Sequence, residues 1–561
     1  MESYKFSQLP YTPTDFEAVQ QELNRLTAQI SGAASADEVA GYIARCDALM
    51  DEVRYAGTLT YIRSSLDCTD EFYQDAVQKE NVGWSMLDTS GYYKALLDSP
   101  FLPQLTQRYG SQFRPALEQN FRLHAAGHEL LAREQVLVSQ YQQKKASLRI
   151  SFRGQLHSES EMFVFFESPD RQTRIDARKA LAQAVLEQAA DFSAILLELI
   201  RTRDQIAKAN GFETYLEYAN AAFSRRGYGE AELDTFCQQV KQELVPLLCQ
   251  LQEEQRNQLG LEKLMSYDSI LRFADGNAIP AGDAAYLTEQ SKRMYDDLCP
   301  SFGQFFRNMV DTESLDVSAS ANKVAGMGFC TELRSGLYPY VFGNCNKTAE
   351  DVSVFTHEIG HAWQCYLTTQ NVTPHILRDM PLDAVEIPSK TMELFTYSYA
   401  ERFFGTDAEK FRQGHFRSAL SEIASFCAIH ELNTWIYTHT DASFEELTAQ
   451  ETRISRLYQP LLDYGELEPF HAQGADLMRN MAVYMFPRYV ISYALSEMCA
   501  MDLFRQRQED PAAAWDAYEK LCASGGSRNY PDTLAQAGLE PAYAEGRVRK
   551  VVAFAREYLN H

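Results

Sequence analysis

Apolar residues recur every three or four positions through most of this chain, and that spacing limits its fold more than any other feature. The stretches Phe16 to Ile30 and Ile175 to Asp204 are clear examples, with polar residues between the apolar ones. A period near 3.6 residues places apolar side chains on one face of an α-helix, where they pack against neighbouring helices. The sequence therefore predicts a mainly α-helical protein. It contains no repeat of roughly 20–50 residues that would indicate a solenoid.

One segment, residues 323–346, breaks the helical pattern. Its sequence is KVAGMGFCTELRSGLYPYVFGNCN, which is rich in glycine, aromatic and β-branched residues. This composition predicts two short strands around a turn near Arg334-Ser335-Gly336. Gly326 and Gly328 would either let an extended peptide backbone approach closely or merely form a bulge. Helical patterning resumes at Ala349 and continues, with breaks, to the C-terminus.

Length and charge narrow the possible organisation and partners. A chain of 561 residues allows about three domains or one large two-lobed body. We predict an N-terminal helical lobe over residues 1–195 and a catalytic domain over residues 196–561. The chain has 52 Lys and Arg against 77 Asp and Glu, a formal net charge of −25. Nucleic acids and anionic membranes are bound by clustered basic side chains, so we expect neither as a partner.

The N-terminus and the cysteines favour a cytoplasmic location. The first ten residues, MESYKFSQLP, contain no basic segment followed by an apolar run, and no window approaches 18 unbroken apolar residues. The 11 cysteines are scattered, odd in number and never spaced as CxxC. Such cysteines are typical of a reducing compartment.

The helix predicted after the hairpin contains the motif His357-Glu358-Ile359-Gly360-His361, an HExxH. Residues four apart lie on the same side of a helix, so both imidazoles can reach one metal ion. Glu358 can then polarise a water molecule bound to that ion. A chance match on a solvated helix is the alternative. Apolar neighbours on both sides of the motif indicate a buried helix, and burying these side chains unpaired would cost several kcal/mol.

A catalytic zinc ion takes three protein ligands and keeps one open position, so a third ligand is needed. Glu386 lies 25 residues after His361, and Glu393 follows seven residues later on nearly the same helical face. Glu386 would be the third ligand, and Glu393 would accept a hydrogen bond from a ligating histidine. Alternatively, Asp383 and Glu386 could form a capping-box-like helix start, with Glu393 in solvent. The residues alone leave these interpretations equal.

The HExxH, the later glutamate within Val385-Glu386-Ile387-Pro388-Ser389 and Glu393 together resemble the thimet-oligopeptidase family of zinc metallopeptidases, in particular its oligoendopeptidase F branch. The resemblance extends to the hairpin and to residues 492–497, SYALSE, and is clearest over about residues 200–550. It implies one zinc ion per chain, held by His357, His361 and Glu386. It also implies a mainly α, two-lobed helical body enclosing a deep substrate channel, with a small β-sheet next to the HExxH helix.

The same resemblance implies that tyrosines near the C-terminus stabilise the oxyanion of the tetrahedral intermediate. The candidates are Tyr489 and Tyr493, which are four residues apart and would share a helical face. Relatives usually have a histidine about ten residues before the last tyrosine, and residues 481–493 contain none. The nearest histidine is His471, which we expect in a loop. The oligomeric state and the cleavage-site preference cannot be predicted.

A second histidine pair at helical spacing, His124 and His128, lacks the glutamate that a zinc motif needs. We interpret it as a solvated helix face.

The sequence therefore predicts a zinc-dependent endopeptidase that hydrolyses internal bonds of short oligopeptides in an enclosed channel, with Glu358 activating a zinc-bound water. Two alternatives remain: a catalytically impaired peptide-binding relative, and a dipeptidyl carboxypeptidase on the same fold.

Overall fold

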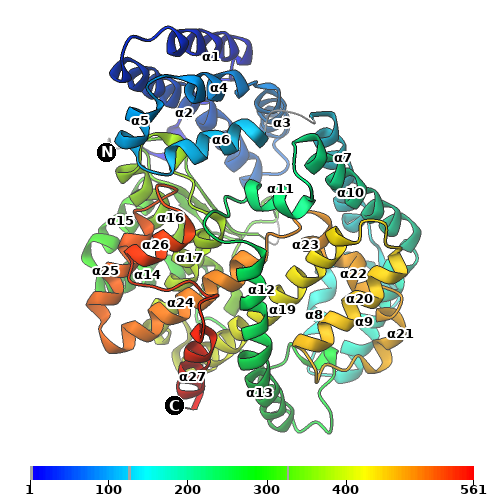
Figure 1. The fold of residues 1–561 in the computed structure, drawn as a ribbon. Coiled ribbons are helices and arrows are strands. Elements are labelled where there is room, and N and C mark those ends of the chain that lie inside the picture. The colour runs from blue at the N-terminus through cyan, green and yellow to red at the C-terminus, as the bar shows by residue number, and fades with distance from the viewer. Residues whose placement is uncertain (1–3, 124–127, 325–326, 561) are drawn as a thin grey trace. The chain divides into compact units, whose positions relative to one another are not determined.

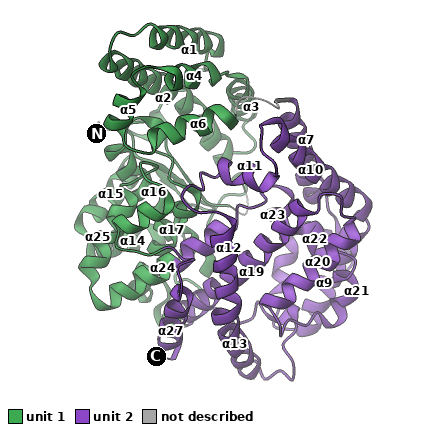
Figure 2. Ribbon diagram, viewed as in Figure 1, with its two compact units in different colours: residues 1–125, 278–409, 499–540 green, residues 126–277, 410–498, 541–561 purple. Residues whose placement is uncertain are grey.

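The computed structural model describes residues 4–123, 128–324 and 327–560. It is mainly helical, as predicted, with two small β-sheets (Figure 1). The chain forms two compact units, each assembled from three separate segments (Figure 2). The first unit contains residues 1–125, 278–409 and 499–540, and the second contains residues 126–277, 410–498 and 541–561. These units are groups of residues that pack together, so they do not test a domain boundary along the sequence. The domain boundary predicted at residues 195/196 falls inside a helix of the second unit and stays a prediction.

The first unit contains an N-terminal group of helices, a middle segment with further helices and the three-stranded sheet, and two helices near the C-terminus. Its α-helices are α1 (Phe16–Ser31), α2 (Ala36–Leu66), α3 (Glu71–Met86), α4 (Ser90–Asp98), α5 (Leu102–Tyr109), α6 (Phe113–Leu123), α14 (Ala284–Leu298), α15 (Pro300–Asp311), α16 (Ala349–Asn371), α17 (Leu382–Phe395), α18 (Glu401–Phe404), α25 (Pro511–Cys522) and α26 (Tyr530–Gln536). Its strands are β3 (Leu315–Asp316), β4 (Phe329–Thr331) and β5 (Tyr340–Phe342).

The second unit holds most of the remaining helices and one β-hairpin. Its elements are α7 (His128–Ala146), β1 (Ile150–Phe152), β2 (Gln155–His157), α8 (Phe163–Phe166), α9 (Arg171–Leu186), α10 (Ala189–Ala209), α11 (Tyr215–Ala222), α12 (Glu230–Gln239), α13 (Val245–Gln258), α20 (Phe444–Tyr458), α21 (Glu468–His471), α22 (Ala475–Arg479), α23 (Met481–Tyr484) and α27 (Arg547–Asn560). Helices α19 (Ala408–Thr438) and α24 (Ile491–Glu509) contain residues of both units.

The N-terminal helices of the first unit share an apolar core with the chain that follows α16. Leu26, Leu105 and Leu117 are fully buried in this core, and Val372 and Leu377 from the segment between α16 and α17 pack into it. Burial of each such side chain contributes about 1.5–3 kcal/mol. This core holds the link between α16 and α17 in place.

The hairpin predicted in residues 323–346 is present as β4 and β5, which pair antiparallel with Phe329 opposite Phe342. The turn is closed by the Leu337 amide, which donates to the Arg334 carbonyl, and Gly336 has a positive φ of 88°. The sequence did not predict β3, which pairs parallel with β5 and makes the strand order β3-β5-β4. Strand β4 therefore lies at an edge of the sheet. It contacts α16, so the expected sheet next to the HExxH helix is confirmed.

Among the described residues, no single helix is long and apolar enough to cross a membrane. The pair α9 and α10 meets the criteria of length and composition only together, across a bend of 64°.

Candidate metal centre

The HExxH residues lie in the third and fourth turns of α16, whose start is well defined by its cap. The Asp351 amide donates to Thr348 Oγ1, and the Thr348 amide donates to Asp351 Oδ2 at 2.7 Å. This reciprocal capping box satisfies two backbone amides that the first turn would otherwise leave unpaired. The helix begins at Ala349, as the sequence pattern predicts.

Glu386 and Glu393 both lie inside α17, and each carboxyl-bearing residue is only 4% exposed. The residue before α17 is Pro381, and no side chain caps this helix start. The alternative in which Asp383 and Glu386 start a helix and Glu393 is solvated is therefore wrong. The helix begins earlier, and both glutamates face the protein interior.

Helix α16 packs closely on α17 because residue 360 is a glycine. A methyl group placed on Gly360 would lie 2.7 Å from the Pro388 carbonyl oxygen and 2.7 Å from Ser389 Cα. Both are backbone atoms of α17 and cannot move aside without moving the helix. Glycine in a helix interior costs about 1 kcal/mol relative to alanine, so its presence here reflects the close approach. The sequence alone does not predict this role of Gly360.

The close approach brings three potential metal ligands together. His357 Nε2 and His361 Nε2 are 3.2 Å apart, and Glu386 Oε2 lies 3.2 Å from the first and 3.1 Å from the second. These three atoms thus form a nearly equilateral triangle. Zinc bonds of about 2.0–2.2 Å in a tetrahedron place ligand atoms roughly 3.3–3.6 Å apart, close to the observed spacing. Two imidazoles and one carboxylate are also the donor set that suits catalytic zinc, so the residues fit the ion.

Further side chains of α17 orient these ligands. His357 Nδ1 lies 2.6 Å from Glu393 Oε1, which confirms Glu393 as the acceptor for a ligating histidine. A proton on Nδ1 leaves the Nε2 lone pair free for a metal. Lys390 Nζ lies 3.4 Å from the same Glu393 oxygen. The Ser389 hydroxyl donates to Glu386 Oε2 at 3.0 Å and so holds the third ligand. The sequence analysis assigned no role to Ser389 or Lys390.

The charges of the centre are strongly coupled. Burial acts to lower the pKa of His357, but hydrogen bonds and charge from Glu386 and Glu393 outweigh it and raise that pKa to about 10. Burial acts to raise the pKa of Glu386, but His361 and His357 hold it well below its usual range. Without a metal, the raised pKa favours the doubly protonated, positively charged form of His357, whose charge partly replaces that of the ion.

Glu358 lies in the same buried region but is not one of the three clustered ligands. It is 8% exposed, and burial raises the pKa of its carboxyl, while His357 and His361 act to lower it. Gly328, just before β4, approaches this part of α16: a methyl group there would lie 2.6 Å from Val354 Cγ1 and 3.5 Å from Glu358 Cγ. What comes close to Gly328 is thus the motif helix itself. Gly326 and the His124–His128 pair involve residues outside the described part of the chain.

The two candidate tyrosines belong to the second unit. Tyr489 and Tyr493 have ring centroids 5.5 Å apart and are half-buried. Helix α24 begins at Ile491, so Tyr489 precedes the helix, and the expected shared helical face is wrong. Arg488, which precedes Tyr489, has a positive φ of 72° and therefore does not have the backbone conformation of an α-helix. The role of the two tyrosines stays a prediction.

Both ring nitrogens of His471 contact other side chains of the second unit. Its Nδ1 lies 2.9 Å from Asp476 Oδ2, and its Nε2 lies 3.2 Å from Thr452 Oγ1. It is 2% exposed and ends α21, so the expectation of a loop is wrong. With both ring nitrogens engaged, His471 is a poor replacement for the missing histidine.

Comparison with known proteins decides the family. Residues 6–123 match the peptidase M3 N-terminal domain, and residues 164–272 and 303–552 match peptidase family M3. The chain belongs to peptidase family M3. The comparison with curated proteins found no match.

Among solved structures, this M3 peptidase is similar to a candidate oligoendopeptidase F, with 32% identity, 99% of each chain covered and a TM-score of 0.90. It is also similar to Pz peptidase A, solved with an inhibitor, with 31% identity, 99% of each chain covered and a TM-score of 0.91. A candidate oligoendopeptidase F from Bacillus anthracis is 28% identical, with 100% of this chain and 99% of that chain covered and a TM-score of 0.86. The protein is therefore a metalloendopeptidase of the M3 family, similar to oligoendopeptidase F, with a candidate His-His-Glu zinc site.

We predict that Gly360→Ala weakens zinc binding at least about tenfold and lowers the free energy of unfolding by about 1–3 kcal/mol, because the added methyl group separates α16 from α17. The zinc affinity can be measured by competition with a chromogenic chelator, and the stability by urea unfolding. Gly41→Ala is the matched control, since Gly41 lies inside α2 with nothing within 4 Å of an added methyl group. It should be neutral or slightly stabilising. Normal zinc affinity in Gly360→Ala would show that the close helix approach does not set the metal geometry.

Proposed function

We propose that this M3 peptidase is a zinc-dependent oligoendopeptidase that hydrolyses internal bonds of short peptides, with one zinc ion bound by His357, His361 and Glu386. The observation that carries the proposal is the near-equilateral triangle of ligand atoms on α16 and α17, with Glu358 on the same helix as the histidines. A cytoplasmic location and an enclosed channel are part of this proposal.

The protein side chains divide the work of peptide hydrolysis. A bound zinc ion would act as a Lewis acid that makes water more acidic and polarises the scissile carbonyl. Glu358 would accept the proton of the attacking water and later deliver it to the leaving amine. Its buried environment suits this exchange, because a raised pKa brings a carboxyl closer to neutral pH. Glu393 and Ser389 would keep His357 and Glu386 oriented throughout.

Strand β4 offers a way to hold the substrate backbone. In the strand order β3-β5-β4, it has a sheet neighbour on one side only among the described strands. An extended peptide can add to such an edge through main-chain hydrogen bonds that do not depend on its sequence. The chain enters β4 beside Glu358, through Gly328. A peptide bound along β4 would thus lie near the proposed base.

We predict that Glu358→Gln retains zinc and lowers turnover by roughly 10²–10⁴-fold, because the amide cannot accept the proton of the water. Turnover is measured with a quenched fluorogenic peptide and zinc by elemental analysis. Glu386→Ala and His361→Ala should instead lose the zinc ion itself. Glu350→Gln, which removes the same charge from the exposed first turn of α16, is the matched control and should leave both unchanged. Turnover near the wild-type rate in Glu358→Gln would remove this residue from the mechanism.

We predict that Tyr493→Phe lowers kcat by roughly 10²–10³-fold with little change in KM, since its hydroxyl would act mainly on the oxyanion of the transition state. Tyr489→Phe should have a smaller effect. His471→Ala should leave kcat nearly unchanged, because both nitrogens of that ring are already bonded to protein groups. An unchanged kcat in Tyr493→Phe together with a strongly lowered kcat in His471→Ala would show that the oxyanion donor has been assigned to the wrong residue.

We predict that peptides of about 5–20 residues are cut and that folded proteins resist, because a concave, enclosed site admits only short unfolded strands. Mass spectrometry of the products of a peptide blocked at both ends tests the cleavage mode. Internal cleavage supports an endopeptidase, whereas activity only on peptides with a free carboxyl end, releasing dipeptides, would identify a dipeptidyl carboxypeptidase. Efficient digestion of a folded protein on a gel would contradict the enclosed channel.

A further inference from the structure

The second unit contains a cavity lined by none of the residues of the metal centre. It lies among α9, α21, α22 and two short 3₁₀ segments, Ser266–Asp268 and Gly465–Leu467, and its volume is about 90 Å³. Its polar lining consists of Arg178, Ser266, Tyr267, Tyr464, His471 and the pair Asp476 and Arg479. A water molecule occupies about 30 Å³ of the liquid, so the cavity has room for a few waters or one small polyatomic ion.

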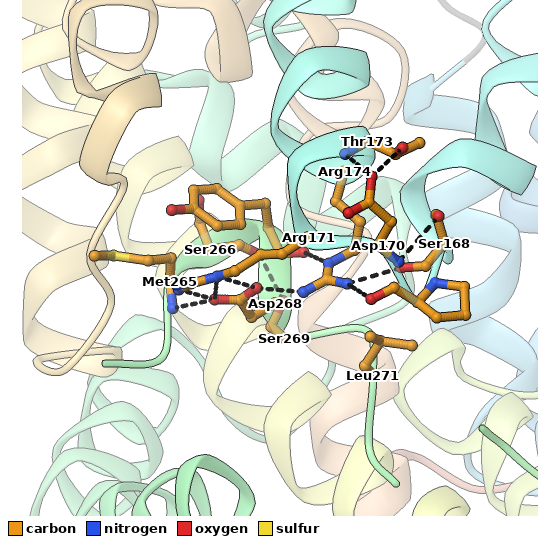
Figure 3. A network of polar contacts seen from close by, with 12 residues as sticks. Ser168, Asp170, Arg171, Thr173, Arg174, Met265, Ser266, Asp268, Ser269 and Leu271 are labelled. Carbon is orange, nitrogen blue, oxygen red and sulfur yellow. Dashed lines mark hydrogen bonds and ion pairs between the residues drawn. The ribbon is translucent and has the colours of Figure 1, made fainter. Parts of the chain in front are cut away.

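One wall of the cavity is fixed by two arginines of α9. Arg171 and Arg174 both bind the fully buried carboxylate of Asp268, each with a nitrogen 2.6 Å from a carboxylate oxygen. Figure 3 shows the two guanidinium groups converging on Asp268, with Ser266 beside them. Charge-assisted hydrogen bonds of this kind are short and strong. They attach the segment that carries Ser266 and Tyr267 to α9 and so set the shape of the cavity.

Arg178, one turn further along α9 from Arg174, has no such carboxylate. Within the described residues its guanidinium makes no hydrogen bond or ion pair, and its buried Nε is unpaired. The guanidinium lies over the Phe166 ring, whose centroid is 4.2 Å from the guanidinium carbon. Burial, together with the charge of Arg479, lowers the pKa of Arg178 to about 10, although the charges of Asp476 and Glu159 act to raise it. The buried Nε of this half-buried cation has no bonded partner, and an anion in the cavity would supply one.

The neighbouring polar groups favour an anion over a cation. The Ser266 hydroxyl is also buried and unpaired. Asp476 is the one carboxylate in the lining, and its Oδ2 lies 2.9 Å from His471 Nδ1. Arg479 also lines the cavity, but its charge is paired with Glu159 Oε1 at 2.6 Å and lies 3.9 Å from Asp476 Oδ1. The lining thus offers the unpaired Arg178 Nε and Ser266 hydroxyl, while its one carboxylate is already bonded, in a chain of net charge −25.

We propose that this cavity is a binding site for one small oxyanion, a phosphate or a carboxylate group, held by the Arg178 guanidinium and the Ser266 hydroxyl. Guanidinium groups bind the paired oxygens of such anions through two parallel hydrogen bonds. The volume excludes a large ligand but accepts the anionic group of one. The inference is independent of the proposed peptidase function, because binding is measured without turnover.

Calorimetric titration of the full-length protein with inorganic phosphate and, separately, with acetate tests this site at constant ionic strength, with chloride as the balancing anion. Wild-type protein should bind one equivalent saturably, and Arg178→Met should bind at least about tenfold more weakly, because the charged hydrogen bonds are lost. Lys179→Met is the matched control: it removes the same charge from the next residue of α9, whose partner is Glu466, and should bind like wild type. Tighter binding of phosphate would indicate an inorganic or phosphorylated ligand, and tighter binding of acetate a carboxylate ligand.

The absence of saturable binding of both anions to wild type, or unchanged affinity in Arg178→Met, would overturn the proposal. Arg178→Lys provides a second test that keeps the charge and loses the paired donors. It should bind with intermediate affinity, and wild-type affinity would show that no guanidinium geometry is involved. In a buffer whose only small anion is chloride, Arg178→Met should melt no lower than wild type, since the removed guanidinium makes no hydrogen bond or ion pair among the described residues and methionine can still pack on Phe166. A marked loss of thermal stability would instead assign Arg178 a structural role.

Discussion

The close contact between α16 and α17 at Gly360 is the constraint on which the metal centre depends. Two histidines one helical turn apart can bind an ion weakly by themselves, but a catalytic site needs a third ligand from another element. Gly360 lets the backbone of α17 approach so closely that Glu386 Oε2 comes within 3.2 Å of both imidazoles. Any side chain at this position would separate the histidines from their partner.

The same helix pair also explains how so many charged groups can be buried together. His357 pairs with Glu393 and His361 with Glu386 on the facing helix, and Glu393 also pairs with Lys390 on its own helix. Burying an unpaired charge would cost several kcal/mol, so pairing keeps the cost within what a folded domain tolerates. The Nε2 atoms and the Glu386 carboxylate nevertheless point at one another, which leaves the centre of the triangle for a cation. The ligands are therefore paired with one another and positioned to bind one metal ion.

Local patterns in the sequence predicted the parts of the fold that local physics decides. The return of helical patterning at Ala349 predicted the start of α16, and the turn near Gly336 predicted the hairpin. The parallel pairing of β3 with β5 was not predicted, because a two-residue strand carries no periodic signal. The shared helical face of Tyr489 and Tyr493 failed for a tertiary reason. Buried Arg488, which binds Thr434 Oγ1 at 2.6 Å, has a positive φ, and the chain continues through turns at Tyr489 and Val490 before α24 begins at Ile491.

In the metal centre, too, local sequence patterns predicted some residues, and tertiary packing decided the roles of others. Spacing and resemblance pointed to Glu386, and the structure places it beside the histidines. Gly360, Ser389 and Lys390 were missed because their roles depend on which helix lies opposite, and one sequence does not show that. A glycine inside an otherwise apolar helix was the only available signal of a close approach.

The most direct test of this account is a crystal structure of the zinc-loaded protein with diffraction data collected on both sides of the zinc absorption edge. The account predicts one anomalous peak per chain, about 2.0–2.2 Å from His357 Nε2, His361 Nε2 and Glu386 Oε2. A peak bound to Glu393 in place of Glu386, or located away from α16 and α17, would contradict it.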